Sequence, residues 1–241
     1  MKTYDTTPLM NGLKQWNIAL TDAQADAFIR YYERLTEWNQ RMNLTAVTEW
    51  NEVCSKHFLD SLSLLSVTDP DSYSSVADIG TGAGFPGIPL KIMHPEWRML
   101  LADSLMKRIR FLQTVIDELK LSSCQAVHAR AEDLGRQKSH REQYDLCVSR
   151  AVANLSTLCE YCLPLVKEGG LFVSYKSAQA EEEIALAESA ICLLGGSIEN
   201  VHTFTLPDSD YGRSLVLIRK QKKTPSRYPR KAGMPAKEPL S

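Results

Sequence analysis

Three glycines in the middle of the chain have the spacing of a ligand-binding turn. The apolar stretch 76–79 reads as a strand, and Gly80, Gly82 and Gly84 follow it. A backbone without Cβ turns sharply and lies flat against a ligand, and a helix that opens after such a turn offers free N–H groups. The pattern is typical of the nucleotide site of a doubly wound sheet, although glycines at this spacing also occur for turn geometry alone.

The exact spacing distinguishes between ligands. The dinucleotide fingerprint G-x-G-x-x-G requires a third glycine where this chain has Phe85. Here the pattern is G-x-G-x-G, with Asp78 two residues before it. A carboxylate near the turn disfavours a pyrophosphate but suits the cationic amino group of a methionine moiety. The turn therefore predicts S-adenosyl-L-methionine, which has no phosphate, as the cofactor.

Polar residues end three further predicted strands, at 98–102, 124–128 and 144–149. Asp103 ends the first, about 20 residues past the glycines, where a ribose diol is bound in related sheets. Ala131 and Glu132 follow the second; Glu132 either caps a helix or lies at the edge that meets the adenine. Arg150 ends the third. The carboxyl ends of parallel strands meet at one edge, so these residues should line one crevice.

The elements that must position these residues alternate between strand and helix. Helices are expected at 87–93, 105–120, 132–135, 155–165 and 179–194, and a further strand at 171–175. The strands 197–205 and 214–220 have no helix between them, so they should pair antiparallel. Residues 8–40 read as two helices, the second beginning at Thr21 or Asp22, a plausible N-cap.

This order predicts an α/β fold of class I S-adenosylmethionine-dependent methyltransferase type. Such folds are Rossmann-like, with a mostly parallel sheet and a reversed last strand. A length of 241 residues suits one such domain with an added element. We expect an N-terminal helical region packed on the core (1–68), the methyltransferase core (69–220) and a basic, Pro-rich, disordered tail (221–241).

Five stretches carry a more specific resemblance. They are 78–90, 103–112, 149–151, 38–46 and 57–62. Together they resemble the GidB/RsmG family of bacterial methyltransferases, which modify the N7 atom of a guanine in the 16S RNA of the small ribosomal subunit. The resemblance extends from about residue 35 to 219.

The resemblance implies a set of cofactor contacts and an activity. The contacts fall on Gly80, Phe85, Ala131, Glu132 and Arg150, which overlap the residues found from the strand ends. The implied enzyme is an S-adenosylmethionine-dependent rRNA (guanine-N7)-methyltransferase whose partner is 16S rRNA or the small ribosomal subunit.

Methylation at N7 requires no catalytic base, because this nitrogen has a free lone pair and no proton to lose. Catalysis then comes from alignment and electrostatics. Arg150 and Asn43 are the candidate residues for orienting the substrate. An ion pair with Asp78 or Asp103 is the rival interpretation of Arg150, and an Asx turn is that of Asn43. His57 is interpreted as structural rather than catalytic.

Basic residues are distributed unevenly. The net charge is −1, yet eight basic residues and one acid lie between Arg219 and Leu240, which leaves −8 on the rest of the chain. Such an end suggests contact with a polyanion or is a solvated, disordered tail, and its four prolines oppose a helix. Lys176, at the end of the strand 171–175, is a further candidate substrate residue that should point toward the crevice, or else an ordinary surface charge. The basic run 107–110 could bind RNA, although exposed helix faces commonly carry such runs.

Other features bear on compartment and class. No stretch approaches the roughly 18 apolar residues of a membrane helix, and the N-terminus is polar. The six cysteines lie in predicted helices and strands, and Cys159-x-x-Cys162 lacks a second ligand pair for zinc. We expect a cytoplasmic monomer with no metal and no membrane contact.

Two alternative functions stay open at this stage. One is a methyltransferase of the same fold that acts on a small molecule or protein, which would not need the basic tail. The other is a cofactor-binding, non-enzymatic ribosome assembly factor. The intact Asp78, glycines and Asp103 oppose a loss of cofactor binding.

Overall fold

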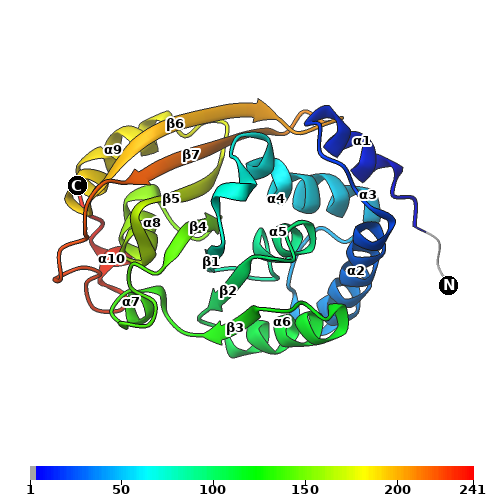
Figure 1. Cartoon of the computed structure of the whole chain (residues 1–241), viewed down its shortest axis with the longest axis horizontal. Helices are drawn as coiled ribbons and strands as arrows, with labels where there is room; N and C mark the ends of the chain where they lie inside the picture. Colours follow the sequence, from blue (N-terminus) through cyan, green and yellow to red (C-terminus); the bar gives the residue numbers. More distant parts are fainter. Residues whose placement is uncertain (1–3) are drawn as a thin grey trace.

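A seven-stranded sheet forms the centre of the molecule, with helices on both faces (Figure 1). The computed structural model describes residues 4–241. The strands are β1 Ser75–Ile79, β2 Arg98–Asp103, β3 Cys124–His128, β4 Tyr144–Arg150, β5 Val166–Ser177, β6 Gly196–Thr205 and β7 Gly212–Lys220. Their order is β3-β2-β1-β4-β5-β7-β6, and β7 runs antiparallel to both its neighbours. The predicted fold class, including the reversed strand, is confirmed.

The helices follow the predicted alternation closely. They are α1 Thr7–Gln15, α2 Asp22–Met42, α3 Trp50–Val53, α4 Asp60–Leu62, α5 Gly87–Met93, α6 Met106–Leu119, α7 Ala131–Leu134, α8 Leu155–Cys162, α9 Glu181–Leu193 and α10 Met234–Lys237. A π-helical turn, Cys54–Leu59, joins α3 to α4. Thr21 caps α2 through a reciprocal capping box with Gln24, which confirms the predicted start of that helix.

Two cores lie on opposite faces of the sheet, because successive strand residues point to opposite sides. Val76 and Val148 belong to the core beneath α2, α5 and α6, whereas Ala77 and Cys147 belong to the core beneath α8 and α9. Every residue of β1 is buried. A strand covered on both faces lacks the polar alternation of a half-exposed one, so the sequence does not reveal which way each side chain points.

The N-terminal helices pack directly on the glycine turn that follows β1. Helix α2 lies against α5 and α6, and Arg34 pairs with Glu118 of α6. The Tyr31 hydroxyl donates to the carbonyl of Ala83, inside the turn. The helical region thereby fixes the loop that the sequence singled out.

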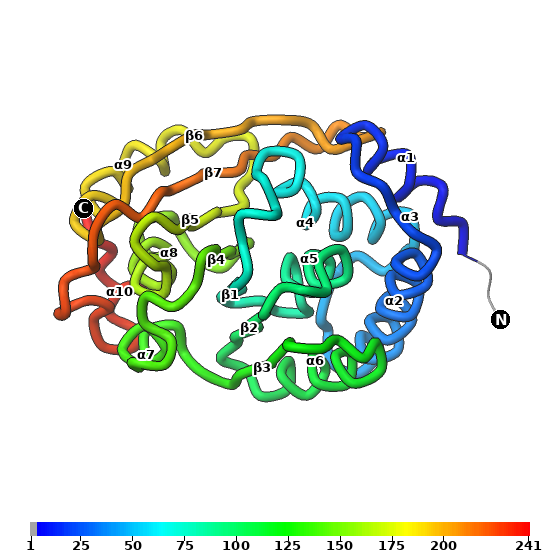
Figure 2. Tube along the Cα trace, viewed as in Figure 1, coloured from blue at the N-terminus to red at the C-terminus, as the bar shows by residue number. Residues whose placement is uncertain are grey.

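The C-terminal segment is packed rather than disordered. Figure 2 shows it (red) running beside α7 and α8, across the sheet from the N-terminal helices (blue). Tyr228 is buried in the second core, and α10 forms one helical turn despite the prolines. Arg141 donates to the carbonyls of Thr224 and Tyr228. The segment departs from the expected disorder because the core offers buried partners that its composition does not show. The domain boundaries at 68 and 220 stay a prediction.

Candidate active site

The glycine turn has the geometry that only glycine adopts without strain. Gly80 and Gly82 have φ of +72° and +62°. A Cβ added at Gly80 would lie 2.4 Å from a methyl group of Val152, so a side chain there would displace Val152 in addition to straining the backbone. At Gly82 the nearest atom to an added Cβ would be the Gly80 carbonyl oxygen at 4.0 Å. The backbone at Gly82 therefore faces open space, as a surface that receives a ligand must.

Two cavities meet along the carboxyl ends of β1, β2 and β4. The first, of about 420 Å³, is lined by predicted residues from all three strand ends and the glycine turn: Gly80, Gly82, Phe85, Asp103 and Arg150. The second, of about 320 Å³, is lined by Ala131 and Glu132. Gly80, Asp103 and Val152 line both cavities. They form one trough that brings together seven of the eight predicted cofactor residues.

Asp78 is the exception, because it lies beneath the turn and not in the trough. Its side chain is 0% exposed. Oδ2 accepts from the Thr81 hydroxyl at 2.6 Å and from the Gly87 amide at 2.8 Å, while Oδ1 has no hydrogen-bond partner within residues 4–241. Burial raises the pKa of Asp78 to about 7 against these hydrogen bonds, which lower it. Asp78 therefore stabilises the glycine turn from its buried side through these two hydrogen bonds.

Asp103 is held rigidly at the centre of the trough. Oδ2 accepts from the Gly82 amide and from Arg108 Nη1, each at 3.0 Å, and Oδ1 accepts from the Leu105 amide at 2.9 Å. Its carboxylate thus links the glycine turn to the start of α6. Arg108 is the member of the basic run 107–110 that reaches the trough.

Arg150 makes an ion pair that the sequence did not predict. Its Nη1 donates to Oδ2 of Asp60 at 2.6 Å, and Arg213 Nε donates to Oδ1 of the same carboxylate at 3.0 Å. The suggested pairing of Arg150 with Asp78 or Asp103 is therefore wrong. Asp60 lies within the stretch 57–62 that carried the family resemblance, which was the signal for it. Arg213 begins β7 and gave no comparable signal.

The rings of His57 and Phe85 stack beside this pair, with centroids 4.5 Å apart. The Arg150 guanidinium lies over the same Phe85 ring at 5.0 Å. Nδ1 of His57 lies 3.1 Å from the Lys56 carbonyl oxygen and 3.4 Å from Arg150 Nη2. Nε2 lies 2.8 Å from the Thr45 hydroxyl. Burial, assisted by the charge of Arg150, lowers the pKa of His57 to about 3. The ring is neutral at physiological pH.

The other two candidates differ in their relation to the trough, because Asn43 lies away from it and Lys176 lies beside it. Asn43 lies outside the cavities and ends α2 in the left-handed conformation. The neighbouring loop is fixed by Asn39, whose side chain bonds both backbone groups of Thr45. Lys176 donates to Glu183 and to the Ala153 carbonyl. It lines a third cavity, which adjoins the trough.

This third cavity is basic. Its volume is about 370 Å³, and it shares His57, Arg150 and Ala151 with the trough. The remaining charged lining residues are Lys56, Asp60, Lys176 and Arg213. Lys56 and Lys176 are paired with Glu52 and Glu183, whereas Arg150 and Arg213 share the single carboxylate of Asp60. One positive charge is therefore left in excess on this side of the site, which favours an anionic ligand.

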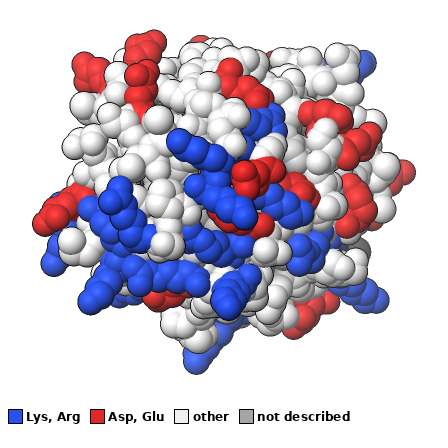
Figure 3. All heavy atoms as spheres, turned by 60° about the vertical axis from the view of Figure 1, so that its left-hand side comes forward, with Lys and Arg blue, Asp and Glu red and all other residues white. Residues whose placement is uncertain are grey.

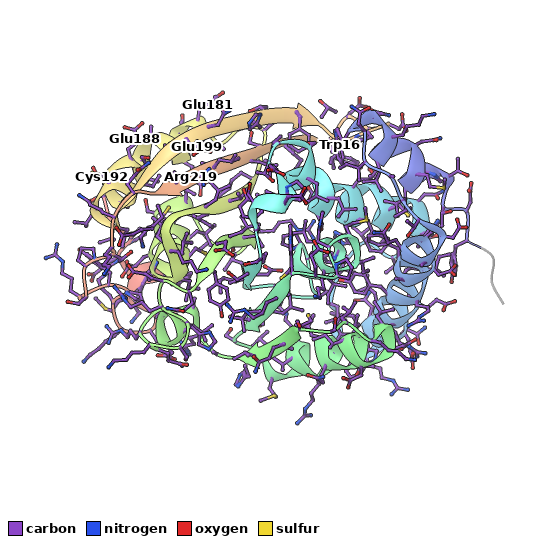
Figure 4. All side chains as sticks on the ribbon, viewed as in Figure 1. Trp16, Glu181, Glu188, Cys192, Glu199 and Arg219 are labelled. Carbon is purple, nitrogen blue, oxygen red and sulfur yellow. The ribbon has the colours of Figure 1, made fainter. Side chains whose placement is uncertain are left out.

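A larger cavity, of about 520 Å³, lies at the opposite end of the strands. It is lined by Tyr73, Asp145 and Lys167, and by the pair of Glu199 with Arg219, whose atoms approach to 2.6 Å (Figure 4). None of the residues singled out from the sequence as cofactor or substrate candidates lines it. Size therefore does not identify the functional cavity here; the chemistry of the lining does.

Residues 4–241 contain no cluster of three His, Cys, Asp or Glu side chains suited to a metal ion. None of their helices is long and apolar enough to cross a bilayer.

The strand order, with β7 reversed between β5 and β6, together with a trough at the carboxyl ends of the strands, is that of the class I methyltransferase fold. A solved structure with this fold is a predicted O-methyltransferase from Agrobacterium tumefaciens, at TM-score 0.52 and 19% identity; 70% of this chain and 81% of that one are covered. The likeness shows the fold alone.

The family follows from the sequence comparisons. Residues 24–211 match the GidB family, described as rRNA small subunit methyltransferase G, and the chain belongs to this family. It is 51% identical to the ribosomal RNA small subunit methyltransferase G of Desulforamulus reducens and 50% identical to that of Lachnoclostridium phytofermentans. In both comparisons the alignment covers 98% of each chain.

Proposed function

We propose that this protein transfers a methyl group from S-adenosyl-L-methionine to the N7 atom of a guanine in 16S rRNA. The observation that carries the proposal is the continuity of the cofactor trough with a basic cavity at Arg150. One compartment suits the methyl donor and the other suits an anionic nucleotide. Family membership supplies the substrate class.

The residues of the trough fit this cofactor. The open backbone surface at Gly82 would receive the methionine part, Asp103 lies where a ribose diol can be bound, and Ala131 with Glu132 lies at the far, adenine end. When bound, the cofactor supplies an electrophilic methyl group on a sulfonium. The protein supplies rigid positioning, because Asp103 is itself fixed by Gly82, Leu105 and Arg108.

The substrate side supplies orientation and charge rather than proton transfer. Asp60 holds Arg150 and Arg213 in place, and the three groups together keep one net positive charge beside the trough. A neutral His57 stacked on Phe85 offers a flat apolar wall. A guanine N7 needs no base, and a ring with so low a pKa is a poor one.

The outer surface supports an RNA partner. Figure 3 shows Lys and Arg side chains gathered on the face that carries the C-terminal segment. Exposed members from that segment are Lys222, Lys223, Arg227, Lys231 and Lys237. We propose 16S rRNA, alone or in the small ribosomal subunit, as the ligand of this face, and a cytoplasmic monomer as the acting form.

The decisive test maps N7-methylguanine in 16S rRNA from cells with and without the protein. One modified guanine should disappear in its absence and return when the wild-type chain is restored. Restoration of Arg150→Ala serves as the matched control and should leave the guanine unmodified. An identical modification map in all strains rejects the proposal. Transfer of labelled methyl groups to small acceptors instead of ribosomal subunits would favour the alternative methyltransferase.

A further inference from the structure

Two buried carboxylates of the core find their partners in the C-terminal segment. The Glu160 side chain on α8 is 0% exposed and pairs with Arg230, whose Nη2 lies 2.7 Å from Oε2. Glu132 of α7 is 5% exposed, and its Oε1 accepts from the Gly233 amide at 2.8 Å. A buried carboxylate without a partner is strongly unfavourable. The core is therefore built to receive this segment.

Further bonds fix the course of the segment between these two points. The Arg230 amide also donates to Glu160, at 2.6 Å, and Arg230 Nη2 donates to the Glu238 carbonyl at 2.7 Å. The Thr157 hydroxyl of α8 donates to the Pro235 carbonyl at 2.9 Å. Residues 230–238 are thus tied to α7 and α8 along their length. We name these residues the C-terminal strap.

The strap completes the second cavity of the trough. Gly233 and Ala236 line this cavity together with Ala131 and Tyr161 of the core. Gly233 has φ +85°, and an added Cβ there would meet nothing within 4 Å among the described residues, so the strap presents bare backbone to the cavity. Bare backbone lets a flat ring approach closely.

We propose that the C-terminal strap is a wall of the cofactor site at its adenine end, with Glu160 and Arg230 as positioning residues that hold it there. The inference rests on the proposed function, because it takes the ligand of the trough to be S-adenosylmethionine. It adds a binding element from outside the residues matched by the family, which end at 211. The adenosine part of the cofactor gains this contact, and the methionine part does not.

The test measures ligand binding by calorimetry with the full chain and with a chain ending at Pro229. The probes are S-adenosylmethionine, methylthioadenosine and free methionine. The shortened chain should bind the two adenosine-containing probes at least tenfold more weakly. The matched control is Lys231→Ala with Lys237→Ala, which removes two exposed charges of the strap and keeps its anchors; its affinities should stay within twofold of wild type. Equal binding by the full and shortened chains overturns the inference.

Two measurements keep the test decisive if the shortened chain fails to fold. Arg230→Met removes one anchor only, and it should weaken the binding of S-adenosylmethionine and of methylthioadenosine to the same extent. In the wild-type chain, amide hydrogen exchange over residues 230–238 should slow when S-adenosylmethionine is added. An unchanged exchange rate over these residues rejects the proposal that the strap contacts the cofactor. A wild-type chain that binds no S-adenosylmethionine would reject the proposed function itself, which is a distinguishable outcome.

Discussion

Arg150 donates to Asp60 at 2.6 Å, and the two residues lie 90 positions apart in the chain. Asp60 belongs to the N-terminal helical region and Arg150 to the end of β4. The pair therefore connects the helical region to the edge of the sheet at which the trough and the basic cavity meet. Through it, the added N-terminal element shapes the substrate side of a common fold.

Asp60→Asn should impair methylation more than it weakens cofactor binding, because Arg150, which Asp60 holds, also lines the trough. The change removes the charge that holds Arg150 and Arg213, so both guanidinium groups lose their fixed positions. Small misplacements in an active site cost about 100-fold in rate, and we expect a loss of that order in single-turnover methylation of small subunits. Glu199→Gln, which breaks the Glu199–Arg219 pair at the opposite end of the sheet, is the control and should keep the rate. A normal rate in Asp60→Asn contradicts a positioning role.

Asp78 should make the protein less stable as pH rises toward neutrality. Its folded pKa of about 7 lies above the ordinary value of 3.8 because of burial. The folded state therefore holds a proton that the unfolded state has released between these values. The contribution is fully favourable below pH 4 and is lost as pH rises through 7.

Asp78→Asn stays neutral and isolates this effect. Its amide oxygen can accept from Thr81 and Gly87, as Oδ2 does now. We expect the difference in unfolding free energy between variant and wild type to shift in favour of the variant from pH 4 to 7, measured by urea unfolding. A difference that is constant across this range would show that Asp78 titrates normally.

The sequence predicted the fold and most of the trough because these depend on local pattern. Strand ends and glycine spacing located Gly80, Gly82 and Asp103 without any knowledge of distant contacts. The direction of Asp78 could not be predicted, because β1 is buried on both faces and shows no alternation. Arg213 meets Asp60 across 153 positions; such a pair is created by tertiary packing alone.

The order of the C-terminal segment also could not be predicted from local sequence pattern. Its charge and prolines indicate disorder when considered alone. Its order depends on Glu132 and Glu160, two carboxylates that the core buries and whose need for a partner no local pattern reveals.

Asp103→Asn should weaken cofactor binding and also destabilise the glycine turn. Loss of a hydrogen bond to a charged group costs about 1.5–3 kcal/mol of affinity. Because the same carboxylate accepts from Gly82 and Leu105, a lower melting temperature should accompany the loss. Asp133→Asn, an exposed acid near the second cavity, is the matched control. Calorimetry with S-adenosylmethionine decides; an unchanged dissociation constant in Asp103→Asn would remove this residue from the cofactor site.

In the Asp78→Asn variant, which removes the titration of Asp78 near pH 7, single-turnover methylation should be nearly independent of pH between about 6 and 8. The substrate nitrogen loses no proton, and the lowered pKa of His57 keeps its ring neutral throughout this range. The measurement is the rate at saturating cofactor and saturating small subunits. A rise of the logarithm of the rate with unit slope across neutral pH would reveal an essential base. Loss of that rise when His57→Asn is introduced would then assign the base to His57.

The basic surface of the C-terminal segment should set the salt dependence of RNA binding. Replacing Lys222, Lys223 and Arg227 with alanine removes three exposed cations that precede the strap and leaves its anchors to Glu132 and Glu160 in place. Every RNA phosphate that the protein no longer neutralises should reduce the slope of log affinity against log salt by about 0.7–0.9. A fall of roughly two is therefore expected if all three cations bind phosphates.

Cofactor affinity should stay unchanged in the same triple variant, because none of the three replaced residues lines the trough. This outcome separates the outer face of the segment from the strap, whose removal is expected to weaken the cofactor. Methylation at saturating RNA should also stay near normal, because these cations assist encounter and not alignment. The control replaces three exposed cations on the other side of the molecule, Lys14, Arg41 and Lys120, and should keep the salt slope. An unchanged slope in the first variant would assign RNA contact to other surfaces, such as Lys56 and Arg213 in the basic cavity.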